Sequence, residues 1–518
     1  MSSLVSAAEG AAGAAPPLKI DPSEWSYLAE GGFHIILRYD GADPKLGGRI
    51  LRIGKKSLGH SKEGGGAAST PEAAPAAALA APDEAGARRK FERGVLIPLL
   101  GAQYVQPGDA VMLSREDIDK IHASIDPLRP AGRIKKDPGH WSSAAQLEPD
   151  KTAFWLELPG GAGGGSGGKE ATVIAVEIKP KGAVMPVGTL VPPGNNRLKY
   201  RVARFDAQQR FKAQGNQSWG SIDRPCLYHP REFYSGEAPR AAATLKELMK
   251  TPQNKLRAWE NGNMLFGAGS GKDKGGEGKS EAGETAGEVE LGKAVVTAGL
   301  GGGDGTSAEA LMDLVGEILA KEPLVSRLVA AQALDVLEIE GGGLVFEKLV
   351  SLCGDSKEEA LSSLENQEAD PFTADPVDAD LLMPEATLAA LRAGTPAPAG
   401  AVELSTLHEK GLRAVEKLSS KDCVQLLRRY IIGLGVMDCS VMMSLKSIGR
   451  QDGEGDSSAV QGDGAAGVLQ MADGRRVGYC VSVVDAGPKP PTKLSGKAKH
   501  EDEIWDFVAA LEEAGQIV

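Results

Sequence analysis

Two lysines at the end of an apolar segment are the strongest chemical signal in this sequence. Glu177, Lys179 and Lys181 alternate in the string EIKPK (177–181), so on a strand their side chains would share one face. Pro180 cannot donate a hydrogen bond to a sheet, which predicts that the strand ends there or lies at an edge. The string therefore predicts two ammonium groups at a strand end.

The basic character continues downstream of this string. Only Asp206 interrupts a further set of six cations, which are Arg197, Lys199, Arg201, Arg204, Arg210 and Lys212. The whole chain has 58 Lys and Arg against 70 Asp and Glu, a formal net charge of −12. This balance excludes a generally basic nucleic-acid-binding protein. Because gathering like charge costs stability, the basic stretch is either a solvated face or, as the asymmetry favours, a site for a polyanion.

Two acids stand beside apolar segments that are typical of strands. Asp438 comes directly before Cys439–Leu445, and Asp485 follows Tyr479–Val484. Carboxylates at neighbouring strand ends suit magnesium-dependent phosphoryl transfer, in which one holds the metal and one orients or deprotonates the acceptor hydroxyl. Two more cations follow Asp485 at spacings of four and eight residues, Lys489 and Lys493.

A pair of glycines lies next to the first predicted strand. Gly31 and Gly32 stand in AEGGF (29–33), and the second predicted strand carries Arg52. Glycines between strands let the backbone approach a phosphate closely, although this pair taken alone fits a hairpin turn better. Combined with the lysines and the two acids, it predicts a kinase.

The elements that must position these residues can be predicted from periodicity. Apolar and β-branched runs predict strands at 33–39, 49–53, 153–158, 172–178, 439–445 and 478–484. Helical spacing predicts helices at 240–250, 307–337, 421–435 and 501–514. Strands come first and helices dominate later, which predicts an α+β protein with two unequal lobes.

Low-complexity segments separate these elements. Gly (67) and Pro (31) make up about a fifth of the 518 residues, above the usual share. Segments without bulky apolar side chains cannot offset chain entropy, and we expect disorder at 1–20, 57–90, 159–169, 267–291, 385–402 and 451–468. The five cysteines lack the spacing of a zinc site or a disulfide framework. With no long apolar run and no secretory signal, we expect a cytoplasmic or nuclear protein that neither enters a membrane nor requires nucleic acid.

Nine strings resemble those of one known family in order and spacing. They are EWSYLAEGG (24–32), GGRILRI (47–53), VLIPLLGAQYV (95–105), EIKPK (177–181), RF (204–205), TPQNKLR (251–257), LDVLEIEG (334–341), MDCSVMMS (437–444) and VVDAGPKP (483–490). The chain resembles the inositol-pentakisphosphate 2-kinases, which use ATP to convert inositol 1,3,4,5,6-pentakisphosphate into the hexakisphosphate, phytate. The resemblance implies a kinase-like fold with a small β-rich N-lobe at 21–158 and a larger C-lobe with an inositol-phosphate-binding region at 159–518.

The resemblance also implies a role for each site residue. Lys179 would bridge the transferring phosphate and the acceptor, Asp438 would act on the axial 2-hydroxyl, and Asp485 together with Asp438 would hold Mg²⁺. The nucleotide would be bound by Gly31, Gly32, Arg52, Arg257 and a hinge at 157–159 that includes Glu157. The substrate phosphates would be bound by Arg133, Lys181, Lys212, Asn254, Lys489 and Lys493.

Some positions depart from the family pattern, and they leave alternatives open. His34 stands where an Asn is usual, Lys493 replaces an Arg, and Lys497 replaces a Tyr. Residues 368–376 contain none of the cysteines of the plant zinc site, so we expect no structural zinc. The sequence predicts a monomeric transferase that uses ATP and Mg²⁺ to make phytate. The alternatives are an inositol-phosphate-binding protein with weak or no catalysis, and a related inositol-phosphate kinase with a different substrate.

Overall fold

The protein is an α+β structure with two antiparallel sheets. The computed structural model describes residues 18, 20–31, 34–55, 84–134, 141–152, 172–214, 225–267, 286–301, 308–366, 379–395, 402–450, 466–487 and 498–516. Contacts divide the chain into two units, and each unit contains one of the sheets. The first unit comprises Met1–Gly94 with Gln106–Phe154, and the second comprises Val95–Val105 with Trp155–Val518.

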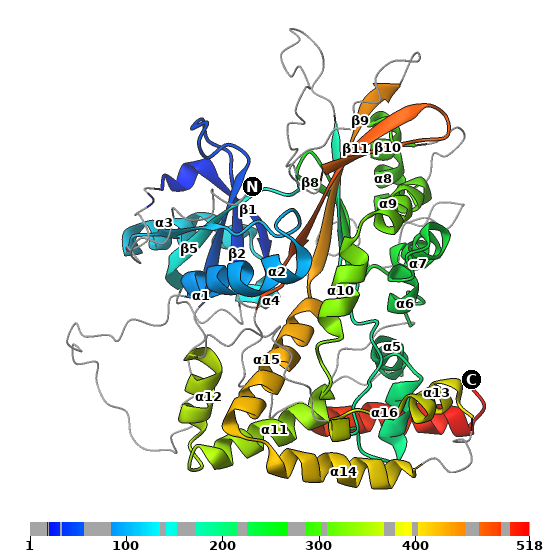
Figure 1. The fold of residues 1–518 in the computed structure, drawn as a ribbon. Coiled ribbons are helices and arrows are strands. Elements are labelled where there is room, and N and C mark those ends of the chain that lie inside the picture. The colour runs from blue at the N-terminus through cyan, green and yellow to red at the C-terminus, as the bar shows by residue number, and fades with distance from the viewer. Residues whose placement is uncertain are drawn as a thin grey trace, which may run out of the picture. The chain divides into compact units, whose positions relative to one another are not determined.

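The first unit is built on a five-stranded sheet in the order β1-β2-β3-β5-β4 (Figure 1). Its strands are β1 (Trp25–Glu30), β2 (His34–Tyr39), β3 (Arg49–Lys55), β4 (Asp109–Met112) and β5 (Trp141–Pro149). Its helices are η1 (Pro22–Glu24), α1 (Glu84–Phe91), α3 (Arg115–Ile125), η3 (Asp126–Leu128) and α4 (Ala131–Ile134), and the π-helical turn η2 (Glu92–Leu96) crosses the unit boundary along the chain. The strands predicted at 33–39 and 49–53 are confirmed.

The core of the first unit follows from two hydrophobic periodicities. Ile35 and Leu37 alternate along β2 and are fully buried, as expected for a half-buried strand. Ser114 caps the N-terminus of α3, which buries Ile118 and Ile121 in the same hydrophobic cluster.

The second unit is built on a six-stranded sheet in the order β10-β11-β9-β6-β7-β8. The strands are β6 (Val173–Ile178), β7 (Leu256–Glu260), β8 (Asn263–Phe266), β9 (Ser440–Arg450), β10 (Ala466–Gln470) and β11 (Arg475–Val484). All six residues of β6 are buried, which explains its nearly unbroken apolar sequence. The strands predicted at 172–178, 439–445 and 478–484 are confirmed.

Helices make up most of the rest of the second unit. They are α2 (Ile97–Leu100), η4 (Asn195–Tyr200), α5 (Arg204–Ala213), α6 (Pro230–Phe233), α7 (Ala238–Lys250), α8 (Ala286–Thr297), α9 (Glu309–Lys321), α10 (Leu324–Gln332), α11 (Glu338–Leu352), α12 (Lys357–Asn366), η6 (Ala379–Leu381), α13 (Glu385–Ala393), α14 (Leu404–Lys417), α15 (Ser420–Met437) and α16 (Ala498–Glu513). The predicted helix at 307–337 is two helices, because Pro323 separates α9 from α10. Figure 1 shows α15 continuing directly into β9. Within the part of the chain described, no helix is long and apolar enough to span a bilayer.

The assignment of residues 95–105 to an N-lobe at 21–158 is wrong, because they pack in the second unit. The Tyr104 hydroxyl donates to Glu322, and the Tyr104 carbonyl accepts from the Val483 amide at 2.8 Å. Arg327 donates to the carbonyl of Leu100 at 2.7 Å. In sequence, residues 95–105 lie between the two stretches that form the first unit. These hydrogen bonds attach them instead to helices and strands much further along the chain.

The predicted loop at 385–402 is wrong over its first half, which forms α13. Ala and Leu dominate this helix, and Leu388 is buried in a hydrophobic cluster. Gly394 ends the helix in the left-handed region at φ 65°, a conformation that glycine adopts without strain. A count of small residues predicted disorder here because it ignored this combination of helix formers and a terminating glycine.

Four other segments predicted to be disordered end in ordered structure. The ordered parts are 84–90 in α1, 286–291 in α8, 466–468 in β10, and Ile20, which is buried in the first core. Each part packs on or pairs with a neighbouring element, as β10 does with β11. Residues 1–17, 57–83, 268–285, 396–401 and 451–465, the glycine run at 159–169 and the predicted strand at 153–158 lie outside the described residues.

Candidate active site

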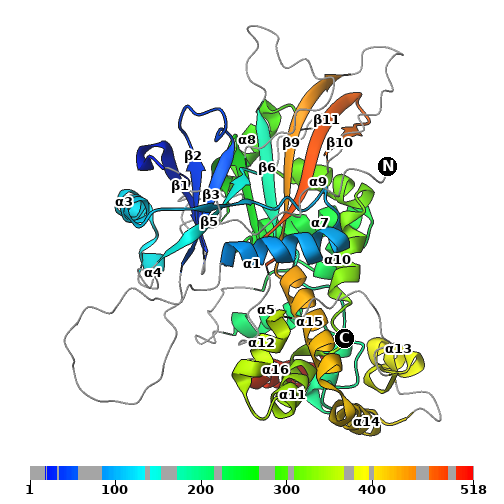
Figure 2. The same ribbon diagram turned by 60° about the vertical axis from the view of Figure 1, so that its left-hand side comes forward.

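Three strands of the second sheet bring the predicted catalytic residues to one edge. β9 lies between β6 and β11, and Figure 2 shows the three side by side. The register places Ile178 opposite Val441 and Val484 opposite Ser440. The chain therefore leaves β6 and β11 and enters β9 at the same edge, where Lys179, Asp485 and Asp438 are found.

The lysines and acids at this edge form two ion pairs. Lys179 Nζ lies 3.6 Å from Asp485 Oδ2, and Lys181 Nζ donates to Asp438 Oδ1 at 2.8 Å. The carboxylates are partly exposed, which leaves them accessible to a ligand. The structure thus brings together the predicted catalytic residues Lys179 and Asp438, the predicted metal ligand Asp485 and the predicted substrate ligand Lys181.

The backbone at this edge adopts an uncommon conformation at two of these residues. Lys181 has φ 65° and Asp485 has φ 59°, values that residues with a β-carbon rarely adopt. Such conformations cost roughly 1–3 kcal/mol each and cluster at functional sites. They also correct the expectation that Glu177, Lys179 and Lys181 share one face of a strand, because β6 ends at Ile178 and the chain turns at Lys181.

Cys439 follows Asp438 in the chain and is fully buried. Burial raises the pKa of its thiol to about 12, and the carboxylates of Asp438 and Asp485 add to the effect while Lys179 opposes it. A thiol with this pKa stays protonated at neutral pH, so Cys439 fills space here and is not a nucleophile.

A third ion pair adjoins the site on β6 and β7. Arg257 Nη1 lies 3.2 Å from Glu177 Oε2, and the Ser440 hydroxyl donates to Glu177 Oε1 at 2.7 Å. Arg257 Nε is buried and has no hydrogen-bond partner among the described residues. Glu177, which the sequence analysis placed only on the lysine face, therefore fixes one side of a guanidinium that was predicted to bind the nucleotide.

The carboxylates at this edge could hold a magnesium ion. In the described ranges, no group of three or more His, Cys, Asp or Glu side chains could hold a metal on its own. Mg²⁺ usually takes one or two carboxylates and completes its shell with water and substrate phosphates. The accessible oxygens of Asp438 and Asp485 fit that requirement.

Lys212 and Lys255 extend the positive charge of the site. Lys212 is half-buried, and its pKa is lowered by burial and by the charges of Lys181 and Arg204. Burial is the main cause that lowers the pKa of Lys255 to about 8; Cys226 opposes it, and the charges of Lys181 and Lys212 lower the pKa further. Lys255 was not predicted from the sequence. Its only signal there is its place in TPQNKLR, next to the predicted ligand Asn254, which is exposed.

The other cations of the basic stretch have a different environment. Lys199 lies 2.6 Å from Glu340 and 3.3 Å from Glu501, and Arg204 also pairs with Glu501. Arg197 and Arg201 both pair with Glu512. The expectation that this whole stretch forms either a solvated face or a polyanion site is wrong for these four residues, because acids of α11 and α16 that are distant in sequence neutralise them.

The first unit holds two of the predicted nucleotide residues that the structure describes, Gly31 and Arg52, whereas Arg257 lies on β7 of the second unit. Arg52 is buried and donates to Glu148 at 2.8 Å, and the Gly31 amide donates to the His34 carbonyl at 2.9 Å. Arg133, a predicted substrate ligand, is exposed on α4. Four predicted site residues lie outside the described residues, namely Gly32, Glu157, Lys489 and Lys493.

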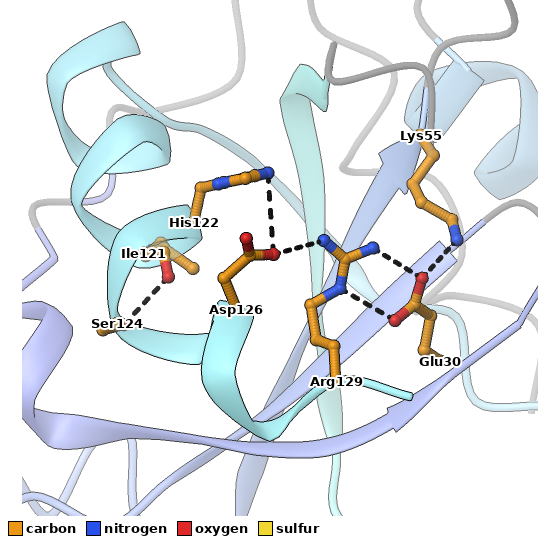
Figure 3. A network of polar contacts seen from close by, with 7 residues as sticks. All are labelled: Glu30, Lys55, Ile121, His122, Ser124, Asp126 and Arg129. Atoms are coloured by element: carbon orange, nitrogen blue, oxygen red, sulfur yellow. Dashed lines mark hydrogen bonds and ion pairs between the residues drawn. The ribbon is translucent and has the colours of Figure 1, made fainter. Parts of the chain in front are cut away.

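A buried charge network next to Gly31 was not predicted from the sequence (Figure 3). Arg129 donates to both carboxylate oxygens of Glu30, at 2.9 and 2.8 Å, and to Asp126 at 2.9 Å. Lys55 donates to Glu30 at 2.5 Å, and Arg129 lies over the ring of Trp141. Burial alone would raise the pKa of Glu30, but these bonds hold it below its usual value. The network fixes the end of β1, directly before Gly31.

Comparison with known proteins identifies one family. A family model described as inositol-pentakisphosphate 2-kinase matches residues 27–503. The chain is 25% identical to the inositol-pentakisphosphate 2-kinase of Arabidopsis thaliana over 506 residues, covering 94% of this chain and 93% of the relative. It is 25% identical to the enzyme of the same name from Oryza sativa subsp. indica over 511 residues, covering 96% and 95%. A relative of that name from Danio rerio is 26% identical over 248 residues, covering 48% of this chain and 45% of the relative.

Proposed function

Because the chain belongs to the inositol-pentakisphosphate 2-kinase family, we propose that it transfers the γ-phosphate of ATP to the 2-hydroxyl of inositol 1,3,4,5,6-pentakisphosphate. The products are inositol hexakisphosphate and ADP. The observation that carries the proposal is the pair of lysine–aspartate contacts at one edge of the second sheet. A protein that only binds anions needs the lysines but has no use for accessible carboxylates beside them.

Asp438 is the proposed acceptor of the hydroxyl proton. As the 2-hydroxyl oxygen forms its bond to the γ-phosphorus, its proton passes to Asp438, and the bond from the γ-phosphorus to the ADP oxygen breaks. Lys181 donates to Asp438 and thereby orients the carboxylate. Lys179, beside Asp485, is placed to stabilise the charge on the transferring group.

Asp485 and Asp438 are the proposed ligands of Mg²⁺. The ion would neutralise charge on the ATP phosphates and on the transition state. Two accessible carboxylate oxygens together with phosphate oxygens are a common ligand set for this metal.

The substrate requires a concentration of cations. Each phosphate carries roughly −1.5 to −2 charge at neutral pH, so the pentakisphosphate carries on the order of −8 to −10. The proposed ligands of these phosphates are Arg133, Lys181, Lys212, Asn254, Lys489 and Lys493. The nucleotide would be held by Gly31, Gly32, Arg52, Glu157 and Arg257, in a two-lobed kinase-like arrangement.

The test is a product analysis. Purified protein is incubated with ATP, Mg²⁺ and a panel of inositol phosphates that differ in the number and position of their phosphates, and the products are separated by anion-exchange chromatography. We expect conversion of the 1,3,4,5,6-pentakisphosphate to the hexakisphosphate. Preferred phosphorylation of another inositol phosphate would identify a related kinase, and binding without conversion would contradict the proposed catalysis.

A further inference from the structure

We propose that Lys255 is an additional ligand for the phosphates of the substrate and that it takes up a proton when the anion binds. The inference rests on the proposed function and deepens it, because it adds to the anion site a residue that the family resemblance did not supply. It also makes substrate affinity depend on pH in a defined direction.

The backbone of Lys255 is fixed to the catalytic edge of the sheet. Its amide donates to the Pro252 carbonyl at 2.9 Å, and its carbonyl accepts from the amide of Lys179 at 2.8 Å. β7 begins at the next residue and pairs with β6. Lys255 therefore occupies a defined position between Lys179 on one side and the predicted ligand Asn254 on the other.

The side chain of Lys255 faces helix α5. Its Nζ donates to Gln253 and lies 5.4 Å from the ring centroid of Phe205. Gln253 donates in turn to Gln209 at 2.8 Å. Phe205, Gln209 and Lys212 are spaced four and three residues apart on α5, so they lie along one helical face. Lys212 thus extends from the same helical face that contacts the Lys255 side chain.

The charges around Lys255 are what make it a candidate ligand. The residue is 6% exposed, and no ion pair between it and an acid is found in the described parts of the chain. The ionisable groups that affect it are Lys181, Lys212 and the Cys226 thiol. A buried ammonium beside two other ammonium groups is costly, whereas a bound polyphosphate would stabilise all three together.

Proton uptake follows from this environment. Because the pKa of Lys255 is lowered to about 8, a substantial fraction of the free protein carries a neutral amine at pH 8. A phosphate beside the amine favours its charged form, so the nitrogen lone pair takes a proton from the buffer as the substrate binds. At pH 8 the uptake at this residue is roughly half a proton for each substrate bound.

Isothermal titration calorimetry of the full-length protein with inositol 1,3,4,5,6-pentakisphosphate tests the inference. Titrations at pH 8 in buffers of different ionisation enthalpy give the number of protons exchanged on binding. For Lys255→Met we expect affinity about tenfold weaker than wild type and the loss of roughly half a proton of uptake. Lys255→Arg keeps a permanent charge, so its affinity should stay within about threefold of wild type while the uptake is still lost. Lys246→Met removes a lysine paired with Asp313 away from this site and should change neither quantity.

The outcomes separate this inference from the proposed function. If the wild-type protein does not bind the pentakisphosphate, the proposed function fails. If the wild type binds but Lys255→Met has the same affinity and the same proton uptake, Lys255 is not a ligand. Should Lys255→Met fail to fold in a thermal melt, Lys255→Arg decides the point, because wild-type proton uptake in that variant would also overturn the inference.

Discussion

Lys199 and Lys255 are both buried lysines of the second unit, and their surroundings are opposite. Lys199 contacts two carboxylates, Glu340 and Glu501, and lies over the ring of Trp505. Burial alone would lower its pKa, but these carboxylates raise it above the usual value. Burial lowers the pKa of Lys255 against the effect of Cys226, and the charges of Lys181 and Lys212 lower it further.

The difference distinguishes cations that stabilise the fold from cations that are available to bind a ligand. The Lys199 ammonium is neutralised within the fold, so it has nothing left to offer a ligand. Around Lys255, Lys181 pairs with Asp438, but no ion pair to an acid is found for Lys255 or Lys212 among the described residues, and a bound anion would supply one. In the first unit, Arg129 is of the structural kind, because Glu30 and Asp126 neutralise it.

Asp438→Asn changes an acid of the proposed binding site, and we expect it to have the largest effect on activity of the variants described here. An amide cannot accept the hydroxyl proton, so we expect phosphate transfer to fall about 10³-fold or more. Substrate affinity should stay within about tenfold of wild type, because only the transition state requires the carboxylate. Single-turnover kinetics and calorimetry measure the two quantities separately. Full turnover in the variant would remove Asp438 from its proposed role.

Lys199→Met tests whether the paired lysine is structural. Removing it leaves Glu340 and Glu501 buried with one fewer partner, which should lower the free energy of unfolding by about 3–5 kcal/mol. Urea titration followed by circular dichroism measures the change. A loss below about 1 kcal/mol would show that the paired and unpaired lysines do not differ as described.

Lys212→Met is the matched variant at a lysine for which the described residues provide no ion pair. We expect the affinity for the pentakisphosphate to fall about tenfold and its dependence on salt to become shallower. The free energy of unfolding should stay the same or rise, because the variant removes repulsion from Lys181 and Arg204. An unchanged salt dependence would count against Lys212 as a phosphate ligand.

The pH dependence of stability gives the smallest effect and the sharpest contrast. The folded-state pKa of Lys255 lies below that of the unfolded chain, so the unfolded chain binds more protons above about pH 8 and stability rises with pH. Between pH 7 and 8.5 the Lys255 contribution should grow by less than about 1 kcal/mol, and it should vanish in Lys255→Met.

The raised pKa of Lys199 acts in the other direction. Its contribution is complete below the unfolded-state value of about 10.5 and is lost as the pH rises through the folded-state pKa. Urea titrations of the wild type and Lys255→Met between pH 7 and 8.5 measure the Lys255 contribution. An identical pH dependence of the free energy of unfolding in the two proteins would contradict the comparison.

From the sequence, the residues at the catalytic edge of the second sheet could be predicted better than the ion pairs of the basic stretch. Strand periodicity located β6, β9 and β11, and the acids and lysines adjoining those strands then had to meet once the strands paired. Glu340 and Glu501, by contrast, lie far along the chain from Lys199. No local pattern reveals such a partner, so the basic stretch from Arg197 to Lys212 looked uniform.

Composition misjudged the segments between elements for a related reason. Low apolar content predicted a loop at 385–402, but α13 needs few large side chains because Leu388 and Leu391 reach a cluster made largely by other elements. Residues 95–105 were assigned to the first lobe from their sequence position. Their place in the second unit depends on Glu322, Arg327 and Val483, which are distant in sequence.

The most direct test of the central claim is the position of the phosphate that the protein adds. The pentakisphosphate is incubated with ATP and Mg²⁺ and either wild-type protein or Asp438→Asn, and the product is examined by phosphorus NMR. The account predicts a new phosphate on the axial 2-oxygen with the wild type and almost none with the variant. Transfer to a different substrate position, or equal product from both proteins, would contradict it.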